Sequence, residues 1–128
     1  MIKVNVKKQS NYPMSSTKIR KNLKNFLASN GIVSDAEVSV ALVGEKKMLE
    51  VGNKYLKDKS LHNVLSFTAD EVVPKFVYPP DGVIHLGEII VCYPKAFEEA
   101  KKENKLIEDK IMELVEHGAL HLMGIHHD

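Results

Sequence analysis

The sequence is poor in the features that mark secreted and membrane proteins. Its 128 residues contain a single cysteine, Cys92, which excludes an intramolecular disulfide and favours a reducing compartment. Cys92 ends the apolar run 89–92, which indicates a buried strand residue rather than a nucleophile. No apolar run is long enough to span a bilayer. The alternating residues 1–7 indicate a strand rather than a targeting segment, so we expect a cytoplasmic, soluble protein with no membrane partner.

Acidic residues are missing from the first 34 positions, which hold seven of the 18 basic residues and the only arginine, Arg20. The rest of the chain holds 11 basic and 17 acidic residues. This asymmetry is typical of a protein with one basic surface that meets a polyanion. Lysines also solvate the outer face of an ordinary helix, so charge alone leaves both interpretations open.

Strand and helix patterns alternate along the chain. Strands are expected at 2–8, 37–43, 64–67 and 83–92. Helices are expected from a cap at Ser15, Ser16 or Thr17 to Asn30-Gly31, at 44–56 with apolar contacts from Met48, Leu49 and Val51, at 94–105, and at 107–123. This order predicts an α/β (α+β) fold with a small mixed sheet packed against several helices. The length is that of a single domain over residues 1–128.

Four of the six histidines lie in residues 117–128, and three of them follow the spacing H-x3-H-x5-H. His117 and His121 are four apart and so lie on the same side of a helix. Gly124 reaches positive φ without a steric penalty, which allows the chain to turn back and bring His127 to the same point. His126 is the alternative third ligand. Three neutral imidazoles with a fourth direction open predict one catalytic zinc ion per chain.

A histidine cluster at a chain end can also be an expression remnant. Here, however, the histidines are interleaved with an apolar stripe at helical spacing, formed by Ile107, Ile111, Leu114, Val115, Gly118 and Leu122. A ligand at the edge of such a stripe is half buried against the core and half open to a cleft. The pattern therefore favours a metal site.

A zinc site with an open position indicates hydrolysis. Metzincin proteases carry H-E-x-x-H-x-x-G-x-x-H, in which the glutamate is the general base. In this chain Gly118 occupies the place of that glutamate. Glu116 points about 100° away around the helix and is a poor substitute. A peptidase is therefore the less favoured hydrolase.

Three segments together resemble the YbeY family of zinc-dependent endoribonucleases. Residues 117–127 resemble its H-G-x-L-H-L-x-G-x-x-H signature, residues 53–67 its N-x-x-Y-R-x-x-D-x-P-T-D-V-L-S-F segment, and residues 85–91 its h-L-G-D-I-h-I strand, where h is apolar. The resemblance implies a zinc-hydrolase-like metal site on the C-terminal helix, with His117, His121 and His127 as ligands of one zinc ion.

The resemblance also implies a function. It implies cleavage of single-stranded RNA, maturation of 16S ribosomal RNA at its 3′ end, and a part in ribosome quality control. The implied partners are ribosomal RNA and proteins of the small ribosomal subunit. The general base is not identified by the sequence.

The chain departs from the family pattern at several positions. Leu56 stands where the family has an arginine thought to hold the scissile phosphate, and a leucine cannot make that bidentate contact. The candidate replacements are the basic residues Lys54, Lys57, Lys59 and Arg20. Asn63 and His126 each replace a carboxylate, and Glu88 replaces a shorter acid. An alternative function is therefore a ribosome-associated zinc-binding module with weak or no catalysis.

Five further polar and aromatic residues have ordinary structural interpretations. Ser66 is expected to be a structural hydrogen-bonding residue, because no histidine partner is evident in the sequence. His62 and His85 are expected to be satisfied or exposed side chains rather than groups that support the metal. Tyr55 and Phe67 are expected to pack in the core rather than stack on RNA bases.

Overall fold

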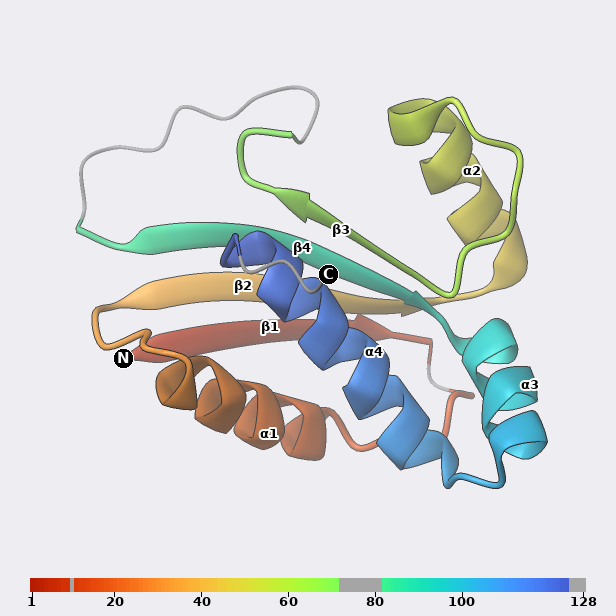
Figure 1. Cartoon of the computed structure of the whole chain (residues 1–128), viewed down its shortest axis with the longest axis horizontal. Coiled ribbons are helices and arrows are strands. Elements are labelled where there is room, and N and C mark those ends of the chain that lie inside the picture. The colour runs from red at the N-terminus through yellow and green to blue at the C-terminus, as the bar shows by residue number, and fades with distance from the viewer. Residues whose placement is uncertain (10, 72–81, 125–128) are drawn as a thin grey trace.

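The computed structural model describes residues 1–9, 11–71 and 82–124, in which strands and helices alternate as expected (Figure 1). The described elements are β1 (Ile2–Lys8), α1 (Ser16–Ser29), β2 (Ala36–Val43), α2 (Glu45–Leu56), β3 (Val64–Thr68), β4 (Ile84–Cys92), α3 (Tyr93–Glu103) and α4 (Ile107–Leu122). The strands form one sheet in the order β1-β2-β4-β3. Strands β1, β2 and β4 are parallel, and β3 is antiparallel to β4. The mixed α/β fold predicted from the sequence is confirmed.

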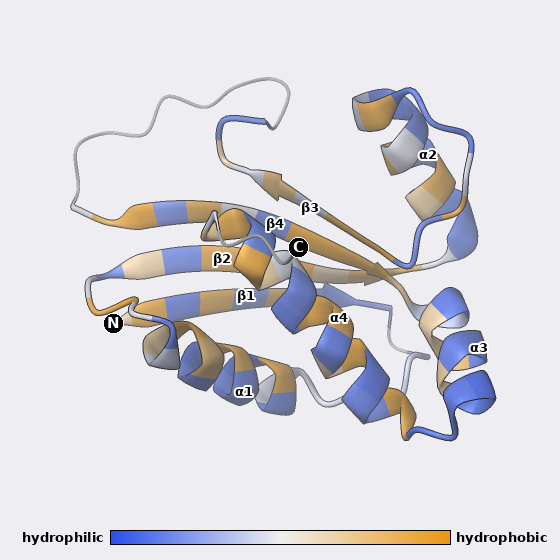
Figure 2. Ribbon diagram, viewed as in Figure 1, coloured by the Kyte–Doolittle hydropathy of each residue, from blue (hydrophilic) through white to orange (hydrophobic). Residues whose placement is uncertain are grey.

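The main core lies between one face of the sheet and helices α1 and α4, which cross that face (Figure 1). Alternate residues of the strands point into this core, as the period of two in a strand requires. The helices bury one apolar stripe each against the sheet, visible as the orange bands in Figure 2. The largest fully buried side chains of this core are Ile19, Leu23, Leu27, Val38, Val40, Ile89, Val91, Ile111 and Val115.

The remaining strand positions of β3 and β4 point to the opposite face, where α2 packs. Met48 and Val51 of α2 form a second cluster there with Phe67, Ile90 and Cys92. Cys92 is fully buried, as the sequence predicted. The expected apolar contact of Leu49 is wrong, because its side chain is 39% exposed. Leu49 lies about 100° around the helix from Met48 and therefore faces away from the cluster.

The helix ends follow local chemistry. Among the three candidate caps, Ser15 is the N-cap of α1, and its side chain accepts a hydrogen bond from the backbone N–H of Lys18. Helix α3 ends two residues earlier than expected, since Asn104 adopts the left-handed conformation at φ 56°. At the end of α4, Gly124 has φ 75°, which confirms that the backbone leaves the helix at this glycine.

Helices long and apolar enough to cross a membrane are absent from residues 1–9, 11–71 and 82–124.

Candidate metal and RNA site

A cleft of about 760 Å³ lies between β3 and α4. Asn63 and residues 64–67 of β3 line one side, and α4 lines the other through side chains from Lys110 to His121. Leu56, at the end of α2, and Glu71, after β3, complete the lining. The cleft therefore brings together residues of the segments 53–67 and 117–127, although the two are distant along the chain.

His117 and His121 both line this cleft, from successive turns of α4. His117 is exposed, whereas His121 is half-buried against β3. The third expected ligand, His127, and its alternative, His126, lie outside the described residues. Within the part of the chain that the structure describes, no three His, Cys, Asp or Glu side chains are grouped closely enough to hold a metal ion. The three-histidine zinc site therefore stays a prediction.

His121 has a partner that the sequence did not reveal. Ser66 Oγ lies 2.6 Å from Nδ1 of His121, a short hydrogen bond that joins β3 to α4. The expectation that Ser66 forms a structural hydrogen bond agrees with this contact. That His121 is the partner could not be predicted from the sequence, because 55 positions separate the two residues.

Gly118 lies where α4 comes closest to the sheet. A β-carbon built at this position would lie 2.8 Å from Cγ2 of Ile89 and 3.5 Å from Cβ of Ser66. Real side chains do not approach this closely, so even an alanine here requires α4 or Ile89 to move. This packing explains why the chain has a glycine where metzincins have a glutamate, since a glutamate at position 118 does not fit between α4 and β4.

Glu71 is an acidic cleft residue that sequence reasoning missed. Its Oε1 accepts hydrogen bonds from the backbone N–H of Thr68, at 2.9 Å, and from the Thr68 hydroxyl, at 3.0 Å. The backbone hydrogen bond is the main cause that holds the pKa of Glu71 below its usual value, against the raising effect of burial. The available signal was the spacing T-x-x-E at 68–71, in which the two side chains can bond locally.

Comparison with known proteins places this arrangement in a family. The sequence model described as "Endoribonuclease YbeY" matches residues 2–128. The chain belongs to the endoribonuclease YbeY family. This confirms the family predicted from the three segments.

Individual relatives agree with this membership. The protein named endoribonuclease YbeY from Thermodesulfovibrio yellowstonii is 37% identical over 91 residues, which cover 71% of this chain and 54% of that protein. The protein of that name from Acinetobacter baumannii is 28% identical over 115 residues, or 90% of this chain and 72% of that protein. The chain thus spans about half the length of the first relative and nearly three quarters of the second.

The fold is also that of a solved structure. The solution structure of TM1509 from Thermotoga maritima matches with a TM-score of 0.59 and 28% sequence identity. The match covers 98% of this chain and 75% of that protein.

The position of the YbeY arginine is on the cleft. Leu56, which replaces it, is 47% exposed and lines the cleft at the C-terminal end of α2. The three lysines proposed in its place, Lys54, Lys57 and Lys59, are exposed but are not among the cleft-lining residues. Lys54 lies over the ring of Tyr55, with Nζ 5.2 Å from the ring centroid. Arg20 is on α1, where its guanidinium contacts the Thr17 hydroxyl.

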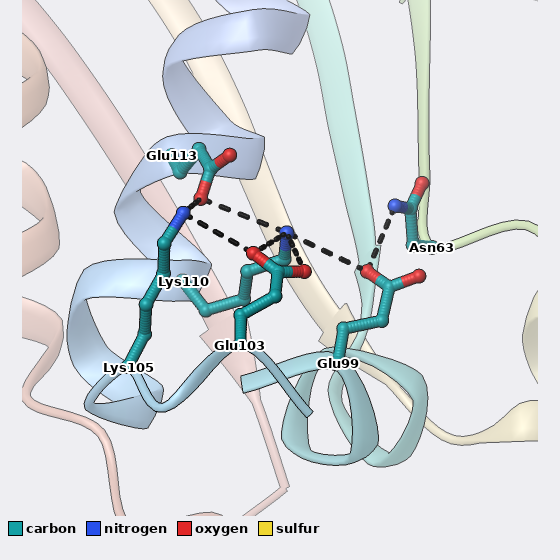
Figure 3. A network of polar contacts seen from close by, with 6 residues as sticks. All are labelled: Asn63, Glu99, Glu103, Lys105, Lys110 and Glu113. Atoms are coloured by element: carbon teal, nitrogen blue, oxygen red, sulfur yellow. Dashed lines mark hydrogen bonds and ion pairs between the residues drawn. The ribbon is translucent and has the colours of Figure 1, made fainter. Parts of the chain in front are cut away.

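The cleft residue Lys110 is the centre of a charge network (Figure 3). Its side chain is only 7% exposed, and its ammonium lies 2.9 Å from Glu103, 3.6 Å from Glu113 and 3.8 Å from Glu99. Burial alone lowers the pKa of Lys110, but these carboxylates raise it above its usual value. Lys110 is thus charged and already neutralised, which leaves little positive potential for a phosphate.

The same network explains a departure from the YbeY pattern. Asn63 Nδ2 donates a 3.0 Å hydrogen bond to Oε1 of Glu99 on α3. An aspartate, the usual family residue, would set a second carboxylate against Glu99 and lose the donor. Asparagine at 63 and glutamate at 99 are therefore matched in this chain.

The other candidate side chains have structural surroundings or partners of their own. Glu116 faces a trough between α1 and α4 and does not line the cleft, in agreement with its expected direction; burial raises its pKa. His62 Nε2 lies 2.8 Å from Asp58, and His85 Nδ1 lies 3.6 Å from Glu37. The rings of Tyr55 and Phe67 pack with centroids 4.9 Å apart, and Phe67 is buried, which confirms their structural interpretation.

Proposed function

We propose that this chain is a zinc-dependent endoribonuclease that cuts single-stranded RNA. The observation that carries the proposal is that His117 and His121 line one cleft from successive turns of α4, within the motif shared with the YbeY family. His127, six residues after His121, is the proposed third ligand of one zinc ion. The proposed unit is one YbeY-type domain over residues 1–128.

The donor set fits a zinc ion. Imidazoles are preferred zinc ligands, and the His121 ring has one nitrogen engaged with Ser66 and the other left for the cleft. The charged side chains that line the cleft are the carboxylates of Glu71 and Glu113 and the ammonium of Lys110, which is already neutralised. The net charge of the described lining is therefore negative and favours binding of a divalent cation over binding of a polyanion. When bound, zinc supplies a Lewis acid for a phosphoryl oxygen and water with a pKa near 7.

The proposed substrate is ribosomal RNA, with maturation of the 16S 3′ end and ribosome quality control in the cytoplasm as the biological setting. Lysines outside the cleft support contact with RNA, because exposed ammonium groups that lack carboxylate partners are free to meet phosphates. Among the described residues Lys3, Lys7, Lys21 and Lys24 are exposed and make no ion pair. Lys54, Lys57 and Lys59 are proposed phosphate contacts near the α2 end, and small-subunit ribosomal proteins are proposed partners.

The test is cleavage of a labelled single-stranded RNA by the purified protein, with zinc content measured on the same sample. We expect about one zinc per chain, cleavage abolished by a chelator, and loss of both zinc and cleavage in His121→Ala. His62→Ala is the matched control, because His62 pairs with Asp58 and is not among the cleft-lining residues, so both should stay unchanged. A wild-type protein without zinc, or with chelator-resistant cleavage, contradicts the proposal.

One observation favours a second candidate, a ribosome-associated zinc-binding module with weak or no catalysis. Leu56 gives the cleft an apolar side chain where the family arginine would grip the phosphate. Stoichiometric zinc together with binding but no cleavage of RNA is the result that selects this candidate. The packing at Gly118 disfavours a metallopeptidase, because it leaves no room for the glutamate base. Hydrolysis of casein by the wild type, abolished in His121→Ala, is the result that would support a metallopeptidase.

A further inference from the structure

We infer that Ser66 is a positioning residue that fixes the ring of His121 so that its Nε2 faces the bound metal. The contact that carries this inference is the 2.6 Å hydrogen bond between Ser66 Oγ and His121 Nδ1. The inference rests on the proposed function only in taking His121 as a zinc ligand.

The contact is built into the fold on the β3 side. Successive side chains of a strand point to opposite faces, and Phe67 points into the α2 cluster. Ser66 therefore points to the face that α4 covers. Its partner across the ladder is Ile89 of β4, the residue that α4 approaches most closely.

The contact is built into the fold on the α4 side as well. Gly118 precedes His121 by almost one helical turn, and its missing side chain leaves the space that Ile89 and Ser66 occupy. Since a β-carbon there would lie 2.8 Å from Ile89, any larger residue would push α4 outward. The distance from β3 to α4, and with it the hydrogen bond to His121, therefore depends on the glycine.

The hydrogen bond couples the tautomer of the ring to the direction of the Ser66 hydroxyl, and the inference takes the arrangement in which Nδ1–H donates. A neutral imidazole has one N–H and one lone pair, so a proton on Nδ1 that is donated to Ser66 Oγ leaves the Nε2 lone pair for the metal. The opposite arrangement, with the hydroxyl donating to Nδ1, places the proton on Nε2 and blocks coordination there. His117 differs, since its exposed ring has no hydrogen-bond partner among the residues described by the structure. The preorganised ligand is thus His121.

The first test is zinc affinity, measured by competition with a chromogenic chelator and independent of RNA cleavage. Loss of a group that orients a metal-bound histidine typically costs about 10–100-fold in affinity, and we expect Ser66→Ala to fall in this range. Ser39→Ala is the matched control. Ser39 is also a strand serine, but it alternates with the buried Val38 and Val40 and so points away from α4. Circular dichroism of both variants checks that the fold is retained.

The second test is the tautomer of His121 in the metal-free protein, read from the ¹⁵N shifts of its ring by NMR. We expect the Nδ1–H tautomer in the wild type and a shift toward Nε2–H in Ser66→Ala. An Nε2–H tautomer in the wild type, or equal zinc affinity of the wild type and Ser66→Ala, overturns the inference and leaves the proposed function standing. Absence of zinc binding in the wild type instead overturns the proposed function itself.

Discussion

Two helical glycines offer a sharp test of how closely α4 packs on the sheet. Gly52 in α2 and Gly118 in α4 both lie within helices with ordinary, negative φ. Replacing a glycine inside a helix by alanine stabilises the helix by about 0.5–1 kcal/mol when there is room for the methyl group. At Gly52 there is room, because the nearest atom to an added β-carbon is His62 Cδ2 at 3.6 Å. We therefore expect Gly52→Ala to raise the free energy of unfolding by about 0.5–1 kcal/mol.

At Gly118 the same gain is opposed by a collision. The added carbon would lie 2.8 Å from Cγ2 and 3.3 Å from Cγ1 of Ile89, a fully buried residue. An extra methyl group in a well-packed core costs about 1–3 kcal/mol, so the net effect of Gly118→Ala is a loss of about 1 kcal/mol. The two variants should therefore differ in sign.

The assay is urea unfolding of the two variants and the wild type in the same buffer. Equal slopes with shifted midpoints would identify changes in stability rather than in the unfolded state. Each variant is a control for the other, since both replace a glycine by an alanine within a helix. Equal stabilisation by Gly52→Ala and Gly118→Ala would refute the close approach of α4 to Ile89.

Three further predictions concern the cleft and the charge network. Asn63→Asp replaces the donor to Glu99 by a second carboxylate, and we expect a loss of about 1 kcal/mol in urea unfolding at pH 7. Leu56→Arg returns a guanidinium to the cleft, and we expect faster cleavage of single-stranded RNA with unchanged zinc content. The pKa of Glu103 is lowered mainly by its hydrogen bond to the Lys110 ammonium, and that of Glu113 by its hydrogen bond to Lys105. The stability that such carboxylates contribute is present above their ordinary pKa of 4.5 and is lost as the pH falls through the lower pKa of the folded state. The midpoint temperature of thermal unfolding should therefore decrease when the pH is lowered below 4.5.

Each of these outcomes has a clear opposite. Unchanged stability of Asn63→Asp at pH 7 would mean that the contact with Glu99 contributes nothing in solution. An unchanged cleavage rate in Leu56→Arg would argue that the phosphate is held elsewhere. The thermal unfolding midpoint should be measured in dilute buffer, where surface charges are least screened. A midpoint that is unchanged from pH 6 to pH 3 would show that the network around Lys110 does not contribute to stability.

The sequence was informative wherever periodicity or glycine chemistry decides the local structure. The His117–His121 pair, the stripe that buries α4 and the positive φ of Gly124 all follow from rules that act over one or two turns. Leu49 shows the limit of such rules, because its apolar character fitted the core but its angle around α2 did not.

Contacts that depend on tertiary distance were not predictable. The partner of Ser66 is 55 positions away, and the partner of Asn63 is 36 positions away. The first contact arises because β3 lies beside α4, and the second because the start of β3 pairs with the end of β4, where α3 begins. No local pattern encodes either arrangement. Glu71 was overlooked for a different reason, since its bond to Thr68 is local but is the kind of contact that the sequence offers at many surface turns.

Two of the departures from the YbeY pattern, Leu56 and Asn63, line the cleft that Lys110 also lines. Leu56 removes a cation there, Asn63 removes an anion, and the buried Lys110 is neutralised by the carboxylates around it. The hydrogen bond of Asn63 to Glu99 and the ion pairs of Lys110 with Glu99 and Glu103 tie α3 and α4 to the start of β3. The Ser66–His121 hydrogen bond lies on the other side of this network, within the two segments that resemble the family, so the proposed cleavage is expected to depend on it rather than on Lys110.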